Sequence, residues 1–472
     1  MARAQIVWFR RDLRVRDHPA LHEAVASGGP VVPVFVVDPA LTRGPAASGP
    51  RAAFLAASLA DLDAALRERG SRLVIRHGDP ATQLPKLARE ADAAVVRWTA
   101  DAAPFGRRRD ERVRAALEQA GIDAVADPGQ YVVDPTAVET QSGTPYTVFG
   151  PFRRRWEDAG RRRIHDAPRR IDTPADIDGE ALPTAADLGQ TKGRPDVSDP
   201  IAAGGETEGL AAARRWLDSP IAHYADRHDR LAGGTSELSP HLRWGTISSR
   251  WLEARSRKLS GEGPAAFVRQ LAWRDFFAHV YRHHPEDRHR EHQPRYRDLH
   301  WEDDAEGLDA WRAGQTGYPL VDAGMRQLAT TGWIHNRARM VVGSFLTKDL
   351  HVDWRHGERH FLSLLLDGEP VQNDGNWQWI ASVGVDPKPY FQRLFNPTRQ
   401  QLRFDPDGEY VRRWVPELER VPDKLLAEPW RMSDDQQRAA GCVIGRDYPD
   451  RIVDHAEQRE VAAARYREAG ES

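Results

Sequence analysis

The first regular pattern of the chain is Gln5-Ile-Val-Trp-Phe9, a short apolar run that leads directly into Arg10-Arg-Asp-Leu-Arg14. Longer helical patterns separate this run from four further β-type runs, at residues 31–37, 72–76, 94–98 and 123–126. Strands that alternate with helices predict a doubly wound parallel sheet with helices on both faces. We therefore expect a Rossmann-like α/β domain with five strands over residues 1–135.

The segment after the first run excludes the usual mode of dinucleotide binding for this domain. It lacks the pattern Gly-x-Gly-x-x-Gly, whose glycines let a dinucleotide approach the backbone in ordinary Rossmann domains. Charged side chains, Arg10 to Asp12, stand there instead. Any ligand of the domain must bind in another way.

The rest of the chain changes character twice. Residues 136–205 predict a long interdomain connector, because Arg, Asp, Pro, Gly and Thr dominate from Arg153 onward and little periodicity remains. Residues 206–472 predict an all-α domain, with helical patterns near 207–217, 247–258, 264–283, 320–330, 333–349, 357–366 and 453–468. The fold class is thus α/β followed by all-α.

Composition narrows the classes of function. The 472 residues carry 67 Lys+Arg against 70 Asp+Glu, a net charge of -3, so nucleic acid could bind only at a local basic patch. The single cysteine, Cys442, excludes an internal disulfide framework and a thiolate metal cluster. No signal peptide and no run of 18 apolar residues is found, so we expect a cytoplasmic protein without a membrane partner.

Tryptophan is concentrated in the helical part. Twelve of the 15 tryptophans follow residue 206, where indoles could stack on flat ligands as well as fill a core. Two polar strings lie among them: Trp333-Ile-His-Asn336-Arg337-Ala-Arg339-Met340 and Asp367-Gly-Glu369-Pro-Val-Gln-Asn373-Asp-Gly-Asn-Trp377-Gln-Trp379. Buried charges must be paired, so these strings form either a structural ion-pair network or a ligand site.

Another motif joins a glycine turn to hydroxyl residues. It runs from Tyr224 to Gly245 and contains Thr235-Ser236-Glu-Leu238-Ser239-Pro at a predicted helix start. Hydroxyls and free backbone N–H groups at such a place suit phosphate oxygens. On spacing alone, the motif is more typical of an ordinary N-cap after a glycine turn.

Taken together these strings resemble the photolyase and cryptochrome family. The resemblance covers nearly the whole chain and includes Gly317-Tyr-Pro-Leu-Val-Asp-Ala-Gly-Met-Arg-Gln-Leu328 and Phe395-Asn-Pro397. It implies an α/β antenna domain followed by a helical domain that binds FAD. By motif match, the cofactor residues are Tyr224, Thr235, Ser236, Leu238, Ser239 and Arg274 on the diphosphate side, and Asn336, Arg339, Asp367, Glu369 and Asn373 around the flavin. Glu369 is a departure, because similar bacterial photolyases carry aspartate there.

The resemblance also implies catalytic roles. Trp377, Trp354 and Trp301 match the family's chain of indoles that carries electrons from the surface to the flavin, and Asn373 matches the residue beside flavin N5. The asparagine resembles photolyases, whereas plant cryptochromes carry aspartate.

For the substrate, the segment around Asn336 resembles photolyases that act on cyclobutane pyrimidine dimers. The matching substrate residues are Gln270, Trp273, Asn336, Arg337, Met340 and Trp379, with no metal. Gln270 replaces a glutamate and His228 an arginine of the family, and Phe391-Gln392-Arg393 carries an extra residue. We expect Arg337, Arg393 and Arg399 to compensate as basic residues near the pocket.

A second chromophore is expected in the α/β domain. Asp101-Ala-Ala-Pro-Phe-Gly106-Arg resembles relatives that use 8-hydroxy-5-deazaflavin, and Phe35, Arg51 and Asp101 match their antenna pocket. Arg243 stands where those relatives have lysine. The alternatives are an empty cleft, flavin mononucleotide or folate.

The resemblance therefore predicts light-driven repair of UV-damaged DNA, in which photoexcited reduced FAD splits cyclobutane pyrimidine dimers, by a monomeric carbon–carbon lyase. A cryptochrome-like blue-light photoreceptor without repair activity is the alternative. A DNA-binding flavoprotein that does not repair is a third reading, because of Gln270 and His228.

Overall fold

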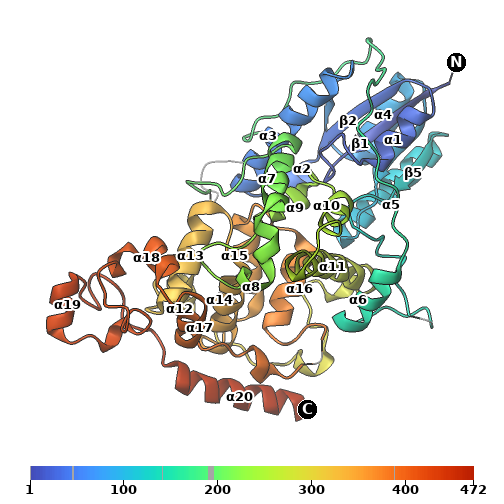
Figure 1. Cartoon of the computed structure of the whole chain (residues 1–472). Coiled ribbons are helices and arrows are strands. Elements are labelled where there is room, and N and C mark those ends of the chain that lie inside the picture. The colour runs from blue at the N-terminus through green and yellow to red at the C-terminus, as the bar shows by residue number, and fades with distance from the viewer. Residues whose placement is uncertain (1, 45–46, 141, 190–195, 387, 472) are drawn as a thin grey trace.

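The computed structural model describes residues 2–44, 47–140, 142–189, 196–386 and 388–471. An amino-terminal α/β unit packs on a larger helical unit, and the long segment between them runs over both (Figure 1). Residues 141 and 190–195 of the predicted connector lie outside the described residues.

The described α/β unit contains a parallel five-stranded sheet with the order β3-β2-β1-β4-β5. This confirms the doubly wound sheet expected from the sequence, and the strand ends differ from the predicted runs by no more than two residues. The strands are β1 (Ala4–Phe9), β2 (Val31–Val37), β3 (Val74–His77), β4 (Ala93–Thr99) and β5 (Asp123–Asp127).

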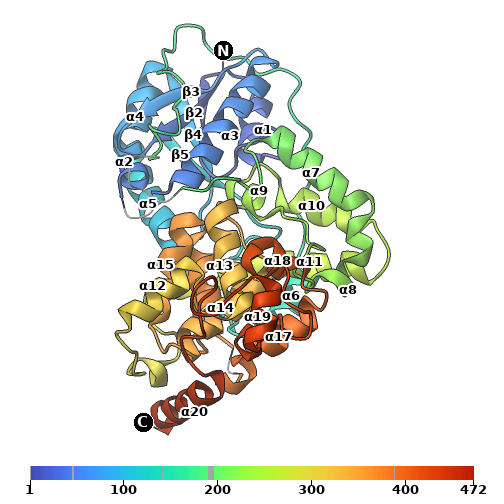
Figure 2. The same ribbon diagram turned by 90° about the vertical axis from the view of Figure 1, so that its left-hand side faces the viewer.

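Helices cover both faces of the sheet, as Figure 2 shows. Side chains such as Val7 and Phe9 pack with α1 (Pro19–Ala26) and α3 (Gly49–Arg67). Their neighbours in sequence, such as Ile6 and Trp8, point to the opposite face and pack with helices α4 (Pro80–Glu90) and α5 (Pro104–Gln119). A sheet buried on both faces explains why its strands are continuous apolar runs. A short helix, α2 (Pro39–Thr42), follows β2.

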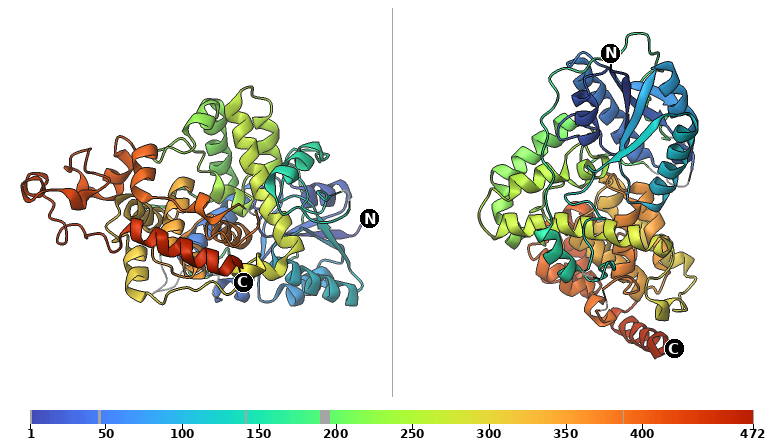
Figure 3. Two further views of the ribbon diagram at one scale, coloured as in Figure 1. Left: turned by 90° about the horizontal axis from the view of Figure 1, so that it is seen from below. Right: turned by 90° about the vertical axis from the view of Figure 1, so that its right-hand side faces the viewer.

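The helical unit surrounds one large core to which Phe345, Trp354 and Trp377 contribute. Predicted helical patterns correspond to α7 (Glu206–Asp218), α10 (Ser249–Ser256), α11 (Glu262–His283), α13 (Pro319–Thr331), α14 (Asn336–Lys348), α15 (Trp354–Leu364) and α20 (His455–Glu471). Helix α9 (Ser239–Trp244) begins where the motif at Thr235–Ser239 predicts a helix start. No helical pattern was recognised for α8 (Tyr224–Arg227), α12 (Ala305–Ala313), α16 (Pro370–Ile380), α17 (Pro397–Phe404), α18 (Glu409–Trp414) and α19 (Asp434–Ala440). The segment around α19 projects from the rest of this unit (Figures 1 and 3).

The connector is more structured than its composition indicates. Residues Phe149–Asp158 form helix α6, which contradicts the expectation of little periodicity from Arg153 onward. Phe152 and Trp156, four residues apart, bury one side of α6 in a core that includes α11, while the intervening arginines hide this pattern in the sequence. Further on, the connector binds the α/β unit through the hydrogen bond from Ile171 N to Arg69 O, 2.8 Å long.

The two units are joined by buried polar contacts close to the carboxyl end of β1. The guanidinium of Arg14 donates to Gly245 O (2.8 Å), and Leu13 N donates to Trp244 O (3.2 Å). Gly245 has φ +63°, and a Cβ there would lie 2.1 Å from Arg11 O, so only glycine fits this close approach. Among the described residues, we find no helix long and apolar enough to cross a bilayer.

Candidate functional site

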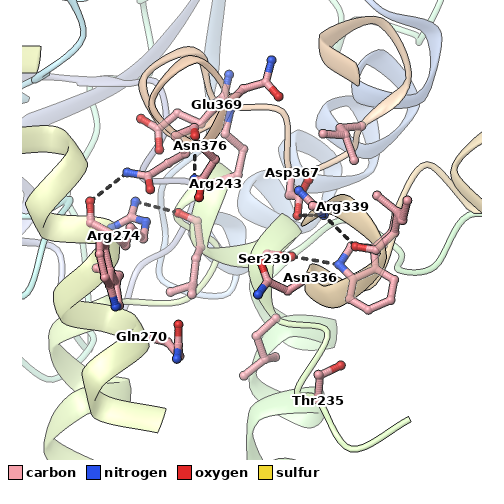
Figure 4. A pocket seen from close by; sticks show the side chains of 18 of the residues that line it. Thr235, Ser239, Arg243, Gln270, Arg274, Asn336, Arg339, Asp367, Glu369 and Asn376 are labelled. Carbon is pink, nitrogen blue, oxygen red and sulfur yellow. Dashed lines mark hydrogen bonds and ion pairs between the residues drawn. The ribbon is translucent and has the colours of Figure 1, made fainter. Parts of the chain in front are cut away.

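A cavity of about 530 Å³ lies in the helical unit (Figure 4). Helices α9, α11, α14 and α16 line it, together with the segments before α9 and α16. The structure brings together here all of the residues that the sequence analysis assigned to FAD: Tyr224, Thr235, Ser236, Leu238, Ser239, Arg274, Asn336, Arg339, Asp367, Glu369 and Asn373.

Several polar atoms of the lining are buried without a hydrogen-bond partner among the described residues. They are Thr235 Oγ1, Arg243 Nη1, Arg337 Nε, Asp367 Oδ1 and Trp379 Nε1. Buried polar groups are normally paired, so this set indicates a polar ligand that supplies the partners. A hydroxyl and a guanidinium suit phosphate oxygens, and the residues present therefore fit a dinucleotide such as FAD.

Arg339 and Asp367 form one ion pair inside the cavity. Arg339 Nη2 lies 2.8 Å from Asp367 Oδ2, and Arg339 Nε donates to Ile334 O at 2.8 Å. These two bonds hold the guanidinium in place, as Figure 4 shows. The arrangement fixes a positive charge at the wall and leaves Asp367 Oδ1 to accept a further hydrogen bond.

Arg274 faces the cavity from α11, opposite that ion pair (Figure 4). Its guanidinium donates to the main-chain oxygens of Gln130 (2.9 Å) and Leu242 (3.2 Å). The first bond reaches the segment that follows β5, so the position of this cation depends on the α/β unit as well as on the helical unit.

Asn373 is oriented by Glu358 of the neighbouring helix α15. Asn373 Nδ2 donates to Glu358 O (2.9 Å) and to Glu358 Oε1 (3.1 Å). Because the amide nitrogen is occupied, the amide oxygen of Asn373 is left for a partner in the cavity. Burial raises the pKa of Glu358.

Glu369 reaches out of the helical unit to Arg11 of the α/β unit. Arg11 lies 2.6 Å from Glu369 Oε1 and 2.7 Å from Asp101 Oδ1. Burial opposes ionisation of Glu369, yet Arg11, Arg274 and Arg243 outweigh it and lower the pKa of its carboxyl. The carboxylate is therefore charged, and it joins the two units beside the cavity.

The predicted substrate residues stand at the same cavity. Gln270 and Asn336 are exposed, while Trp273, Arg337, Met340 and Trp379 are half-buried. Phe149 of α6 stacks on Trp273 with ring centroids 3.7 Å apart and an angle of 9°. The guanidinium of Arg393 lies 4.1 Å from the centroid of Trp379. Each indole thus has a packed neighbour that holds its ring plane.

Arg393 lies near the pocket but is buried. Arg393 is 1% exposed. Its guanidinium pairs with Asp386 at 2.9 Å, and its main-chain oxygen accepts from buried Lys348 Nζ at 3.0 Å. Arg393 flanks the pocket through its contact with Trp379, but its buried guanidinium is already paired inside the protein. Arg337 is half-buried and pairs with Asp229 at 2.7 Å, and Asp229 in turn lies 3.2 Å from His228.

Trp377 and Trp354 belong to one core cluster, and the third predicted electron-transfer tryptophan, Trp301, packs against it. Trp377 lines the cavity, and its ring packs on Gly357, where an added Cβ would lie 2.1 Å from the indole. Trp354 begins the same helix as Gly357 and is fully buried. Val352, two residues before Trp354, forms an isolated β-bridge with Glu302. Glu302 directly follows Trp301, which is half-buried.

The predicted antenna residues do not line this cavity, and two of them have protein partners. Phe35 is buried in β2, two residues before the end of this strand. Arg51 binds Leu362 O and, at 3.0 Å, Leu365 O of the helical unit. Asp101 binds Arg11, which with Arg10 lowers the pKa of this buried carboxyl to about 2.

Other lining residues were not assigned to this cavity from the sequence. The sequence matched Arg243 to the antenna site, but this residue lines the FAD cavity. Burial lowers the pKa of its guanidinium to about 9, and its Nε donates to Gly368 O at 3.0 Å. Trp333 Nε1 donates to Ser239 Oγ at 3.1 Å, and Gln372 Nε2 to Arg274 O at 2.7 Å. Arg243 lies four residues after Ser239, and this helical spacing is the signal that could have placed it.

Comparison with known proteins gives a consistent result. Residues 5–174 match the family model described as DNA photolyase, and residues 267–468 match the FAD binding domain of DNA photolyase. The chain is 44% identical to a deoxyribodipyrimidine photo-lyase of Streptomyces griseus, over 96% of this chain and 97% of that one.

Two solved structures share the whole fold. A bacterial class III photolyase from Agrobacterium tumefaciens superposes with a TM-score of 0.93 at 37% identity, covering 100% of this chain and 98% of that chain. An archaeal photolyase from Sulfolobus tokodaii, described with two FAD molecules and a novel light-harvesting cofactor, gives a TM-score of 0.84 at 32% identity, covering 98% and 100%.

Proposed function

The chain belongs to the DNA photolyase family, and on this premise we propose that it is a deoxyribodipyrimidine photo-lyase that repairs UV-damaged DNA. The observation that carries the proposal is the cavity whose lining joins every residue matched to FAD with every residue matched to a pyrimidine dimer. One cavity can therefore hold the cofactor and admit the substrate beside it.

The residues have distinct tasks in this reaction. When bound, reduced FAD supplies the light-excited electron that opens the dimer. Arg274 and the hydroxyls of Thr235, Ser236 and Ser239 hold phosphate, and the ion pair of Arg339 with Asp367 keeps a positive charge near the flavin. Asn373, turned by Glu358, offers an amide oxygen, which accepts a hydrogen bond but supplies no proton.

The opening of the cavity suits a pair of bases that are turned out of the DNA double helix. Trp273 and Trp379 offer indole surfaces for stacking, which contributes about 1–3 kcal/mol per base. Gln270 and Asn336 are exposed there and can donate to or accept from a pyrimidine edge. A damaged pair costs less to extrude than a normal one, because its base pairing is already weakened.

The direct test uses an oligonucleotide with one thymine dimer and the purified holoprotein, chemically reduced without air. We expect absorbance of the thymine bands to recover under blue light, and not in darkness or with oxidised protein. Trp379→Ala should weaken binding of the damaged strand, and Trp414→Ala, which changes a half-buried tryptophan outside the cavity lining, serves as the matched control. Gln270→Glu tests whether the amide limits binding.

The same experiment distinguishes DNA repair from the alternative function, a blue-light photoreceptor without repair activity. Holoprotein that retains FAD and is reduced by light, yet leaves the dimer intact, would contradict repair of this lesion and favour a photoreceptor. The half-buried indoles of Trp273 and Trp379 in the cavity lining support repair.

We also propose a second chromophore in the α/β unit, with 8-hydroxy-5-deazaflavin as its identity. Support comes from the motif around Asp101 and from Phe35 near a strand carboxyl end, where α/β sheets bind ligands. Mass spectrometry of the chromophores released from holoprotein made in a host that synthesises deazaflavin tests this. Release of a folate, flavin mononucleotide or a second FAD instead would overturn the identity. The monomeric state and the boundaries at residues 135 and 206 stay predictions.

A further inference from the structure

A cluster of metal-ligating side chains lies on the turn that follows α11, outside the cavity. His284, Asp287 and His292 each present one ligand atom, and these atoms lie within 4.8 Å of one another. No metal site was expected from the sequence. The cluster depends on how the turn folds back, which the spacing of three and five residues does not reveal.

His284 is arranged as metal-binding histidines usually are. Its Nδ1 lies 3.5 Å from Glu286 Oε1, and its Nε2 is buried with no hydrogen-bond partner among the described residues. A ligating histidine commonly gives one ring N–H to a carboxylate, which orients the ring and directs the other nitrogen at the metal. The unpaired Nε2 is costly unless something occupies that position.

Asp287 and His292 supply the remaining donors. His292 Nδ1 lies 2.6 Å from Asp287 Oδ2, a hydrogen-bonded pair in the absence of a metal. Two ligands of one tetrahedral Zn²⁺ stand about 3.3 Å apart, given bond lengths near 2.0–2.1 Å. A modest separation of this pair would therefore admit an ion, and the Asp287 carboxylate supplies negative charge.

The turn that carries these donors is fixed from outside. Gln378 of α16 accepts from His292 N (3.0 Å) and donates to Asp287 O (2.7 Å) and Arg290 O (3.0 Å). Within the turn, Asp287 N donates to His284 O at 3.2 Å. The ligand positions are thus held before any ion binds, which lowers the entropy cost of binding.

We propose that His284, Asp287 and His292 bind one divalent transition-metal ion of the zinc type, with water in the fourth position. Two imidazoles and one carboxylate favour Zn²⁺ over the oxygen-seeking Mg²⁺ and Ca²⁺. The side chains of His284 and His292 are 27% and 21% exposed, so an ion can enter from solvent. Glu286 acts as a positioning residue for His284.

The site adjoins the electron-transfer tryptophans. Glu291, one residue before His292, accepts from Trp354 Nε1 at 3.2 Å and pairs with Arg355 at 2.8 Å. A bound ion would stiffen the same turn that holds Trp354.

The test uses tag-free holoprotein stripped with a chelator and titrated with Zn²⁺ in competition with a chromophoric chelator. We expect one tight equivalent, and Co²⁺ in its place should give the intense visible bands of a tetrahedral site. His284→Ala and Asp287→Asn should abolish the tight equivalent, and Glu286→Gln should weaken it roughly 10- to 100-fold. His300→Ala, whose ring faces Glu302 at 3.8 Å on the surface, is the matched control and should bind as wild type.

A second readout covers the case in which Asp287→Asn folds poorly. Zn²⁺ should raise the Tm of the wild type and of His300→Ala, but not of His284→Ala, while FAD content stays equal in all three. Loss of the tight equivalent in His300→Ala would overturn the proposal. So would a wild type that binds no more Zn²⁺ than His284→Ala.

Discussion

The amide nitrogen of Asn373 donates to both the main-chain oxygen and the carboxylate of Glu358, at 2.9 and 3.1 Å. Glu358 belongs to α15 and does not line the cavity, whereas Asn373 lines it from α16. The carboxylate therefore sets the direction of the amide without touching the ligand.

Replacing Glu358 with leucine should impair repair more than FAD binding. Loss of one hydrogen bond of this kind costs about 1 kcal/mol, or roughly fivefold in rate if the amide turns away. Repair yield and FAD retention of Glu358→Leu measure the two effects separately. Glu358→Gln keeps an acceptor and should stay close to wild type; an equal fall in Glu358→Gln would show that charge, and not acceptance, matters.

Interrupting the tryptophan series should separate photoreduction from repair. Trp354→Phe keeps a packed aromatic ring but removes the readily oxidised indole, so light should no longer reduce bound FAD efficiently. Dimer repair by chemically reduced Trp354→Phe should persist. Trp430→Phe changes a half-buried tryptophan against Tyr318, 5.2 Å away, and should leave photoreduction unchanged; equal loss in both variants would contradict the assigned route.

Asp275 should make the protein less stable at neutral pH than in mild acid. Burial raises the pKa of this carboxyl to about 6, despite hydrogen bonds from Trp156 and Val133 to Oδ2, and Oδ1 has no partner among the described residues. Because the folded pKa exceeds the unfolded one, the favourable protonated form is lost as pH rises through 6.

Asp275→Asn removes this penalty and can keep the acceptor oxygen in place. We expect it to stabilise the protein at pH 8 by about 2–3 kcal/mol, a Tm increase of several degrees, and the gain should shrink as pH falls from 6 towards 4. Thermal unfolding of wild type and variant across this range measures it, with the exposed Asp309→Asn as control. A gain independent of pH would contradict the explanation.

Arg11 should be indispensable to the junction of the two units. Arg11→Met removes the cation that pairs with both buried carboxylates, Asp101 and Glu369, and breaking a buried pair costs about 3–5 kcal/mol. The Tm and FAD retention should both fall. Neutralising the partners as well, in Arg11→Met with Asp101→Asn and Glu369→Gln, should restore most of the Tm. Arg3→Met, which breaks an exposed pair with Asp92, should change little.

How far the sequence predicts the molecule depends on the kind of contact. The strands were predicted within two residues because each is a short apolar run covered by helices on both faces. Helix α16 was missed because Asn373, Asp374 and Gly375 disfavour helices, and nearly all its sides are buried, which removes the amphipathic pattern. The cavity residues were found by motif and not by periodicity.

Partners that lie far apart in sequence could not be predicted. Arg51 binds carbonyl oxygens more than 300 residues away in the sequence, and Glu369 binds Arg11. These contacts depend on how the two units dock, which the sequence does not show. The burial of Arg393 could not be predicted either, because a sequence shows charge but not burial.

The stacking of Phe149 on Trp273 has a consequence for protein engineering. Phe149 belongs to the connector, yet its ring forms part of the support for an indole at the cavity mouth. Glu206, the first residue after the connector, accepts main-chain N–H groups of Val15 (2.7 Å) and Arg16 (3.1 Å) in the α/β unit. A chimera that exchanged either unit with that of a relative would therefore have to keep the contacts of the connector as well. The connector resembles a simple linker in the sequence, but the two units cannot be exchanged independently of it.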